Sequence, residues 1–135
     1  MSSPIDRTAE TRTHRWLGID HVQLAIPVGA EDRARAFYVD VLGLVEVPKP
    51  EVMAARGGAW FEAGDVRIHV GGEASFVPAR KAHPALIVSG LRRFIEVSGL
   101  DARWNEELAD VVRCHVEDPF GNRIELIDSD RGDAA

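Results

Sequence analysis

The sequence has too few cysteines for disulfide bonds or thiolate metal sites. The 135 residues include one cysteine, Cys114, which excludes an intrachain disulfide and any site built from several thiolates. Cys114 alternates with Val112 and Val116, and this spacing predicts a buried, unreactive thiol on a strand. Candidate chemistry therefore has to be sought among the histidines and carboxylates.

Long apolar runs and concentrations of positive charge are also absent. The apolar runs fall well short of a membrane span, and the opening segment lacks the apolar stretch of a secretory signal. The chain carries 16 basic and 22 acidic residues, a net charge of −6, and no basic face for nucleic-acid phosphates. We therefore expect one cytoplasmic domain that binds neither nucleic acid nor membrane.

One pattern occurs twice along the chain. "IDHVQLAIP" at 19–27 and "KAHPALIVS" at 81–89 each place a histidine ahead of a run in which one parity is apolar. Helical patterns follow at 29–44, ending at Gly43, and at 89–100, with Ser89 as its cap. Each half continues with a short strand and a hairpin. The pattern predicts an α+β fold of two β-α-β-β-β modules whose helices cover a sheet.

The boundaries follow from this repeat. Module one is expected at 17–72 and module two at 82–128, together forming a single domain at 17–128. The first hairpin is predicted to turn at 63–65 and the second at 118–122. Residues 1–16 are predicted to be a flexible leader and residues 129–135 a flexible tail.

Four polar side chains occupy equivalent positions in the two halves. They are His21 and His83 at the two opening strands and His69 and Glu125 in the two closing strands. A lone strand histidine is more often a hydrogen-bonded structural residue than a ligand, but the symmetry favours a shared metal site. Imidazole nitrogen with carboxylate oxygen suits divalent Zn, Ni, Mn, Co or Fe, and the sequence does not distinguish among them. His115 either faces the same site or is exposed.

Three stretches resemble the vicinal oxygen chelate superfamily, which includes glyoxalase I, bleomycin-resistance proteins and extradiol dioxygenases. They are the opening "GIDHVQLAI", the helix end "FYVDVLGL" and the closing hairpin "EDPFGNRIELID". The resemblance covers about residues 17–128. It implies that the two modules form a curved mixed sheet, with the helices on its outer face and a divalent metal and substrate in its concave cavity. By position, it implies His21, His69, His83 and Glu125 as metal ligands.

The resemblance also implies a function and further site residues. Glu125 would be the catalytic base, and Gln23, Trp60 and His115 would contact a small-molecule substrate, with core packing as the other interpretation of Trp60. The expected protein is a homodimeric metal-dependent enzyme of isomerase, lyase or dioxygenase type that chelates vicinal oxygens. His69 replaces the usual carboxylate of glyoxalase I, which disfavours glutathione adducts. The alternative is a metal-free protein of the bleomycin-resistance type that sequesters a drug or another small molecule.

Overall fold

The predicted duplicated architecture is confirmed in the computed structural model, which describes residues 13–130. The elements are, in chain order, β1 (Val22–Pro27), α1 (Glu31–Arg35), η1 (Ala36–Val41), β2 (Val45–Val47), α2 (Glu51–Ala54), β3 (Ala59–Ala63), β4 (Val66–Glu73), β5 (Ala85–Val88), α3 (Leu91–Ser98), β6 (Arg103–Asn105), β7 (Arg113–Glu117) and β8 (Arg123–Asp128). Residues 1–12 and 131–135, most of the expected leader and tail, lie outside the described residues.

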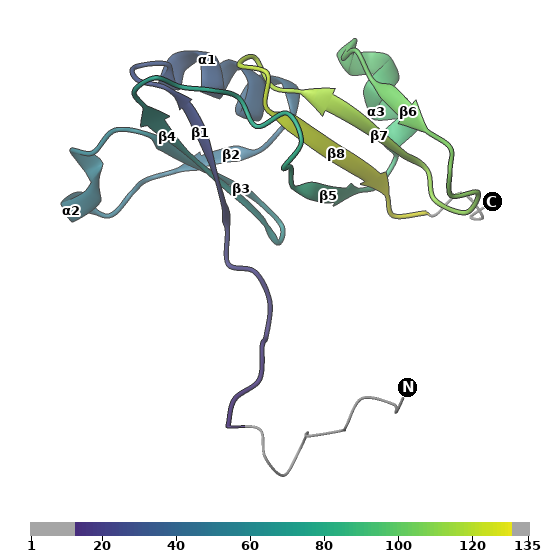
Figure 1. Cartoon of the computed structure of the whole chain (residues 1–135), viewed down its shortest axis with the longest axis horizontal. Helices are drawn as coiled ribbons and strands as arrows, with labels where there is room; N and C mark the ends of the chain where they lie inside the picture. Colours follow the sequence, from purple (N-terminus) through teal and green to yellow (C-terminus); the bar gives the residue numbers. More distant parts are fainter. Residues whose placement is uncertain (1–12, 131–135) are drawn as a thin grey trace.

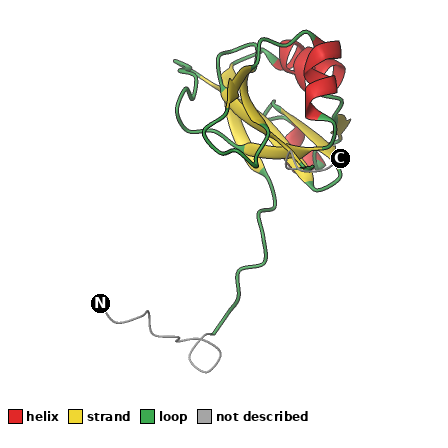
Figure 2. Ribbon diagram, turned by 90° about the vertical axis from the view of Figure 1, so that its right-hand side faces the viewer, coloured by secondary structure: helices red, strands yellow, loops and turns green. Residues whose placement is uncertain are grey.

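Each module forms its own four-stranded mixed sheet. The order is β1-β4-β3-β2 in module one and β5-β8-β7-β6 in module two. In both sheets the first and last strands of the module pair in parallel, and the other pairs are antiparallel. Figure 1 shows the two sheets side by side, and Figure 2 shows the larger helices together beside the curved strands, with a short helix seen behind the strands. The last strand of each module therefore lies next to the first, which brings the predicted ligand positions together within each module.

The two predicted helical spans are present with two differences, and the short helix α2 was not predicted. The first helical span divides into α1 and the π-helix η1, and it ends before Gly43, whose φ is +81°. In the second span the predicted cap at Ser89 is wrong, because the N-cap position is Gly90. The Leu91 N–H instead donates to Oδ2 of Asp128, 3.3 Å away on β8. A distant carboxylate thus replaces the local cap that the sequence suggested.

The apolar parity of the strands forms one core that spans both modules. Ile26 and Phe61 of module one and Ile124 of module two are fully buried in it. Cys114 is also fully buried, and burial raises the pKa of its thiol to about 11, in line with an unreactive residue. Among residues 13–130, no helix has the length and apolar character needed to cross a membrane.

The closing turn of module two fastens the modules together. Asp118 and Asn122 are 4 % and 1 % exposed, and the Tyr38 hydroxyl of η1 donates to Oδ2 of Asp118 at 2.8 Å. The Asn122 amide donates to the Ala25 carbonyl of β1 at 2.9 Å and accepts from the Ala79 N–H at 2.9 Å. Because these groups are buried, each needs its partner. The "DPFGN" turn is therefore an anchor for module one as well as a hairpin loop.

Candidate metal centre

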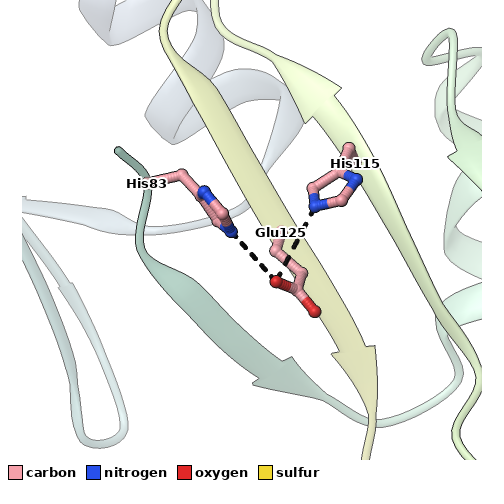
Figure 3. A group of neighbouring side chains, drawn as sticks. All are labelled: His83, His115 and Glu125. Atoms are coloured by element: carbon pink, nitrogen blue, oxygen red, sulfur yellow. Dashed lines mark hydrogen bonds and ion pairs between the residues drawn. The ribbon is translucent and has the colours of Figure 1, made fainter. Parts of the chain in front are cut away.

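Three side chains of module two converge on one point (Figure 3). His83 precedes β5, Glu125 lies on β8, and His115 lies on β7 opposite Glu125 in the strand register. Nε2 of His83 is 3.1 Å and Nε2 of His115 is 3.7 Å from the same carboxylate oxygen, Oε1 of Glu125. The two imidazole planes are at 90° to each other. Since β8 lies between β5 and β7, the sheet itself places the carboxylate between the two histidines.

The hydrogen bonding of His83 leaves a lone pair aimed at Glu125. Nδ1 of His83 is 2.7 Å from the Lys81 carbonyl oxygen, which can only accept, so Nδ1 carries the proton. In neutral His83 the other nitrogen, Nε2, then has a lone pair directed at an anionic oxygen. Such a contact is repulsive unless a proton or a metal cation lies there. A backbone carbonyl that fixes the tautomer in this way is a common support for a metal-binding histidine.

Arg113 holds the other oxygen of the same carboxylate. Its Nη1 donates to Oε2 of Glu125 at 3.1 Å, and its Nη2 lies 3.7 Å from Oε1 of Glu107. Burial alone would raise the pKa of Glu125, but the hydrogen bonds from His83, when Nε2 of His83 carries a proton, and from Arg113 outweigh burial and lower that pKa. Nε of Arg113 is buried and has no hydrogen-bond partner among the described residues. Glu125 is therefore kept ionised, with Oε1 turned towards the histidines.

The predicted residues of module one form a different arrangement. His69 is 6 % exposed and lies between two rings, with centroids 3.9 Å from His21 and 4.1 Å from Trp60. Burial is the main reason that the pKa of His69 is lowered. Nδ1 of His21 is 2.9 Å from the Asp20 carboxylate, which leaves Nε2 of His21 free to accept.

A cavity lies over this stack of rings. It measures about 510 Å³. The residues that line it all belong to module one: Asp20, His21, Gln23, Met53, Trp60, Glu62, Arg67 and His69. Three predicted site residues, Gln23, Trp60 and His21, therefore share one open space with His69.

The nitrogen lone pairs of His21 and His69 do not point at a common position in this arrangement. They are stacked with an interplanar angle of 17°. An imidazole lone pair lies in the plane of its ring, so two nearly parallel rings direct their lone pairs along separate planes. At least one of the two rings would have to turn before both could bind one ion at about 2.0–2.1 Å. The stack serves readily as a flat surface for a planar group.

The structure thus divides the four predicted ligands into two pairs. His83 and Glu125 are in contact on module two, and His21 and His69 are in contact on module one. One group of at least three potential metal donors is found among the described residues. It consists of His83, His115 and Glu125, whose donor atoms all lie within 4.8 Å of one another. The sequence analysis predicted His115 as a possible substrate contact but did not predict a role for Arg113. Arg113 has the same strand parity as His115, and this parity could have indicated that Arg113 faces the site.

The module-two cluster fits a divalent metal ion chemically. Two imidazole nitrogens and one carboxylate oxygen, with no sulfur, are the ligands of Zn, Fe, Mn, Co or Ni sites. The cluster also carries the supporting contacts that metal ligands usually have, from Lys81 to His83 and from Arg113 to Glu125. The donor set does not select one metal among these.

Three solved structures illustrate the similarity of this chain to known proteins. A glyoxalase family protein from Bacillus anthracis is 45 % identical, with a TM-score of 0.83, over 87 % of this chain and 98 % of that one. The fosfomycin resistance protein FosX from Listeria monocytogenes is 13 % identical, with a TM-score of 0.66, over 87 % and 96 %. A lactoylglutathione lyase from Agrobacterium tumefaciens is 19 % identical, with a TM-score of 0.57, over 80 % and 92 %. No family model and no curated protein matches the sequence.

Proposed function

The chain belongs to the glyoxalase family of the vicinal oxygen chelate superfamily, and from this premise we propose that it is a divalent-metal-dependent enzyme acting on a small oxygen-rich molecule. The observation that carries the proposal is the contact between His83 and Glu125. When His83 is neutral, this geometry directs a nitrogen lone pair at an anionic oxygen 3.1 Å away. A metal ion satisfies both atoms at once.

The proposed enzyme is a homodimer. Within one chain, His21 precedes β1 and His69 lies on β4 of the first sheet, whereas His83 precedes β5 and Glu125 lies on β8 of the second. We propose that a second copy presents its module one to module two of the first, which would add His21 and His69 to the site. A closed two-fold assembly of this kind also covers open sheet edges. A cytoplasmic location is part of the same proposal.

Each side chain has a definite task in this proposal. His83 and Glu125 would hold a divalent ion, which would supply Lewis-acid polarisation of substrate oxygens. Glu125 is the candidate base, and Arg113 orients it by holding Oε2. Gln23 and Trp60 line the cavity, where they are placed to hydrogen-bond and to stack against a substrate. The reaction is of isomerase, lyase or dioxygenase type.

Metal content tests the proposal directly. Protein purified without a chelator or a nickel column is analysed for bound metal, and its thermal unfolding is followed with Ni(II), Zn(II), Mn(II) or Co(II) at pH 7.5 and pH 5.5. We expect at least one metal to raise the Tm at pH 7.5 and to do so less at pH 5.5, because protonated imidazole does not bind metal. Glu125→Gln is the matched control and should respond weakly. A Tm that no metal changes at either pH, with no metal bound, would contradict the proposal.

The second candidate is a metal-free protein that sequesters a small molecule. The observation that favours it is the module-one cavity, where Trp60, His69 and His21 form a flat stack beside the carboxylates of Asp20 and Glu62. A planar cation is attracted to such a surface by stacking and by charge. Quenching of tryptophan fluorescence by a cationic drug in metal-free protein, with no response to any metal, would support this candidate.

A further inference from the structure

Module two of a single chain contains enough donor atoms to bind a metal ion. We infer that His83, His115 and Glu125 form a complete three-donor centre for a divalent ion within module two, with His115 as a ligand. This inference rests on the proposed function and deepens it. It assigns His115 as a metal ligand instead of a substrate contact. It also implies that module two can hold the ion without the histidines of module one.

Donor spacing is the first argument. Two ligands at about 2.0–2.2 Å from one ion, at tetrahedral or octahedral angles, lie roughly 2.9–3.6 Å apart. The nitrogens of His83 and His115 lie 3.1 and 3.7 Å from Oε1 of Glu125, and all three donor atoms lie within 4.8 Å of one another. Small side-chain shifts therefore suffice to close this group around an ion.

Ring orientation is the second argument, and it distinguishes the two histidine pairs. The planes of His83 and His115 are at 90°, and Nε2 of each lies near the same oxygen (Figure 3). The planes of His21 and His69 differ by 17° and are stacked. Because lone pairs lie in the ring planes, the first pair already converges and the second pair has to rearrange.

Rigidity of the supports is the third argument. His115 and Glu125 are direct partners in the register of two central strands, β7 and β8. The Glu125 N–H donates to the Pro84 carbonyl at 3.0 Å, so the residue next to His83 is tied to the same strand. Sites built on strands hold their donors more closely than sites on loops. Two histidines and one carboxylate leave open positions on the ion, which two vicinal oxygens of a substrate can occupy.

Cobalt binding by a small set of full-length variants tests the inference. Metal-free protein is titrated with Co(II), following the visible absorption of the bound ion and measuring the Kd by competition with a chromophoric chelator. His115→Gln is compared with the double variant His21→Gln/His69→Gln. Glu125→Gln is the loss-of-site reference, and His14→Gln, an exposed histidine outside both modules, is the matched control. His115→Phe is included as a second replacement, and circular dichroism verifies that each variant is folded.

We expect His115→Gln and His115→Phe to weaken Co(II) binding at least tenfold and to change the cobalt spectrum. The double variant should still bind one Co(II) per chain and should lose less affinity than either His115 variant, because the histidines of module one only add to a centre that module two already holds. Parent-like affinity in both folded His115 variants would overturn the inference and leave the proposed function standing. Loss of Co(II) in the double variant as complete as in Glu125→Gln would also overturn it. A parent protein that binds no Co(II), and none of the other metals, would instead remove the proposed function itself.

Discussion

The two modules repeat one topology but end their closing hairpins in different ways. In module one, β3 and β4 are joined by an exposed turn at Gly64 and Asp65. In module two, the turn between β7 and β8 buries Asp118 and Asn122 against η1 and β1 of the other module. The same strand pairing is thus compatible with a free turn and with an anchoring turn, because pairing depends on the strands and anchoring depends on the loop side chains.

The equivalent polar positions of the two modules also differ in what surrounds them. In module one, the closing-strand position is His69, which lies between two aromatic rings over an open cavity. In module two, it is Glu125, which has His83 and His115 on one oxygen and Arg113 on the other. Module two therefore has the organised donor set, and module one has the surface suited to a planar ligand.

The anchoring turn gives the largest expected effect. Asn122→Ala removes the side-chain partner of the Ala25 carbonyl, the Ala79 N–H and the Asp118 carboxylate. Leaving several buried polar groups unpaired should lower the free energy of unfolding by about 2–4 kcal/mol. Urea unfolding followed by circular dichroism measures the change. A loss below about 1 kcal/mol would mean that water satisfies these groups in the variant and that the turn is a weaker anchor than its burial indicates.

Two arginines, one in each module, provide the second prediction. Arg113→Gln should weaken Co(II) binding by about 10–100-fold, because Glu125 then loses the partner that fixes its second oxygen. Arg67→Gln is the matched change in module one, where Arg67 lies 3.6 Å from Asp20 and is 43 % exposed. It should alter the Kd less than twofold, since exposed ion pairs contribute little. Equal effects of the two substitutions would indicate that overall charge, and no specific contact, controls metal affinity.

Each module holds one histidine that should make stability depend on pH. Burial is the main cause of the lowered pKa of both His69 and His115. In metal-free protein the unfolded chain takes up these protons near pH 6.5, whereas the folded protein does so at lower pH. The unfolded state then binds more protons, so the free energy of unfolding falls as the pH drops from about 7 to 5. Urea unfolding in chelator at pH 7.5, 6.5 and 5.5 measures this decrease.

A double variant identifies the source of that pH dependence. His69→Gln/His115→Gln should show a flatter dependence over the same range, because neither position can be protonated. The single variants divide the decrease between module one and module two. If the double variant keeps the parent's slope, other groups titrate with unfolding and the two buried histidines are not responsible.

The exposed turn of module one gives the smallest expected effect. Asp65→Ala should change the free energy of unfolding by less than about 0.5 kcal/mol, since Asp65 lies in an exposed turn. The same urea assay used for Asn122→Ala measures it. An effect as large as that of Asn122→Ala would show that the two turns are equivalent and would remove the contrast between the modules.

Local patterns in the sequence were enough to predict much of this protein. Alternating apolar residues such as Leu24 and Ile26 predict strands that bury one face, and Gly43 and Gly99 predict where the helical spans end. The repeated order of these signals predicts two modules of the same topology, because each unit pairs its own strands. The pairing of His83 with Glu125 follows from the same logic, since the first and last strands of a module are neighbours.

Contacts between distant segments were decided only by the tertiary structure. Asp128 replaces Ser89 at the start of α3, and Asn122 reaches Ala25, because folding brings together groups that no local spacing relates. The convergence of His115 on Glu125 and the stacking of His21 on His69 depend on side-chain direction, to which the sequence pattern contributes only parity. Parity assigns a residue to a face of a sheet. Which neighbours it meets on that face depends on strand order and packing, and these form only in the folded chain.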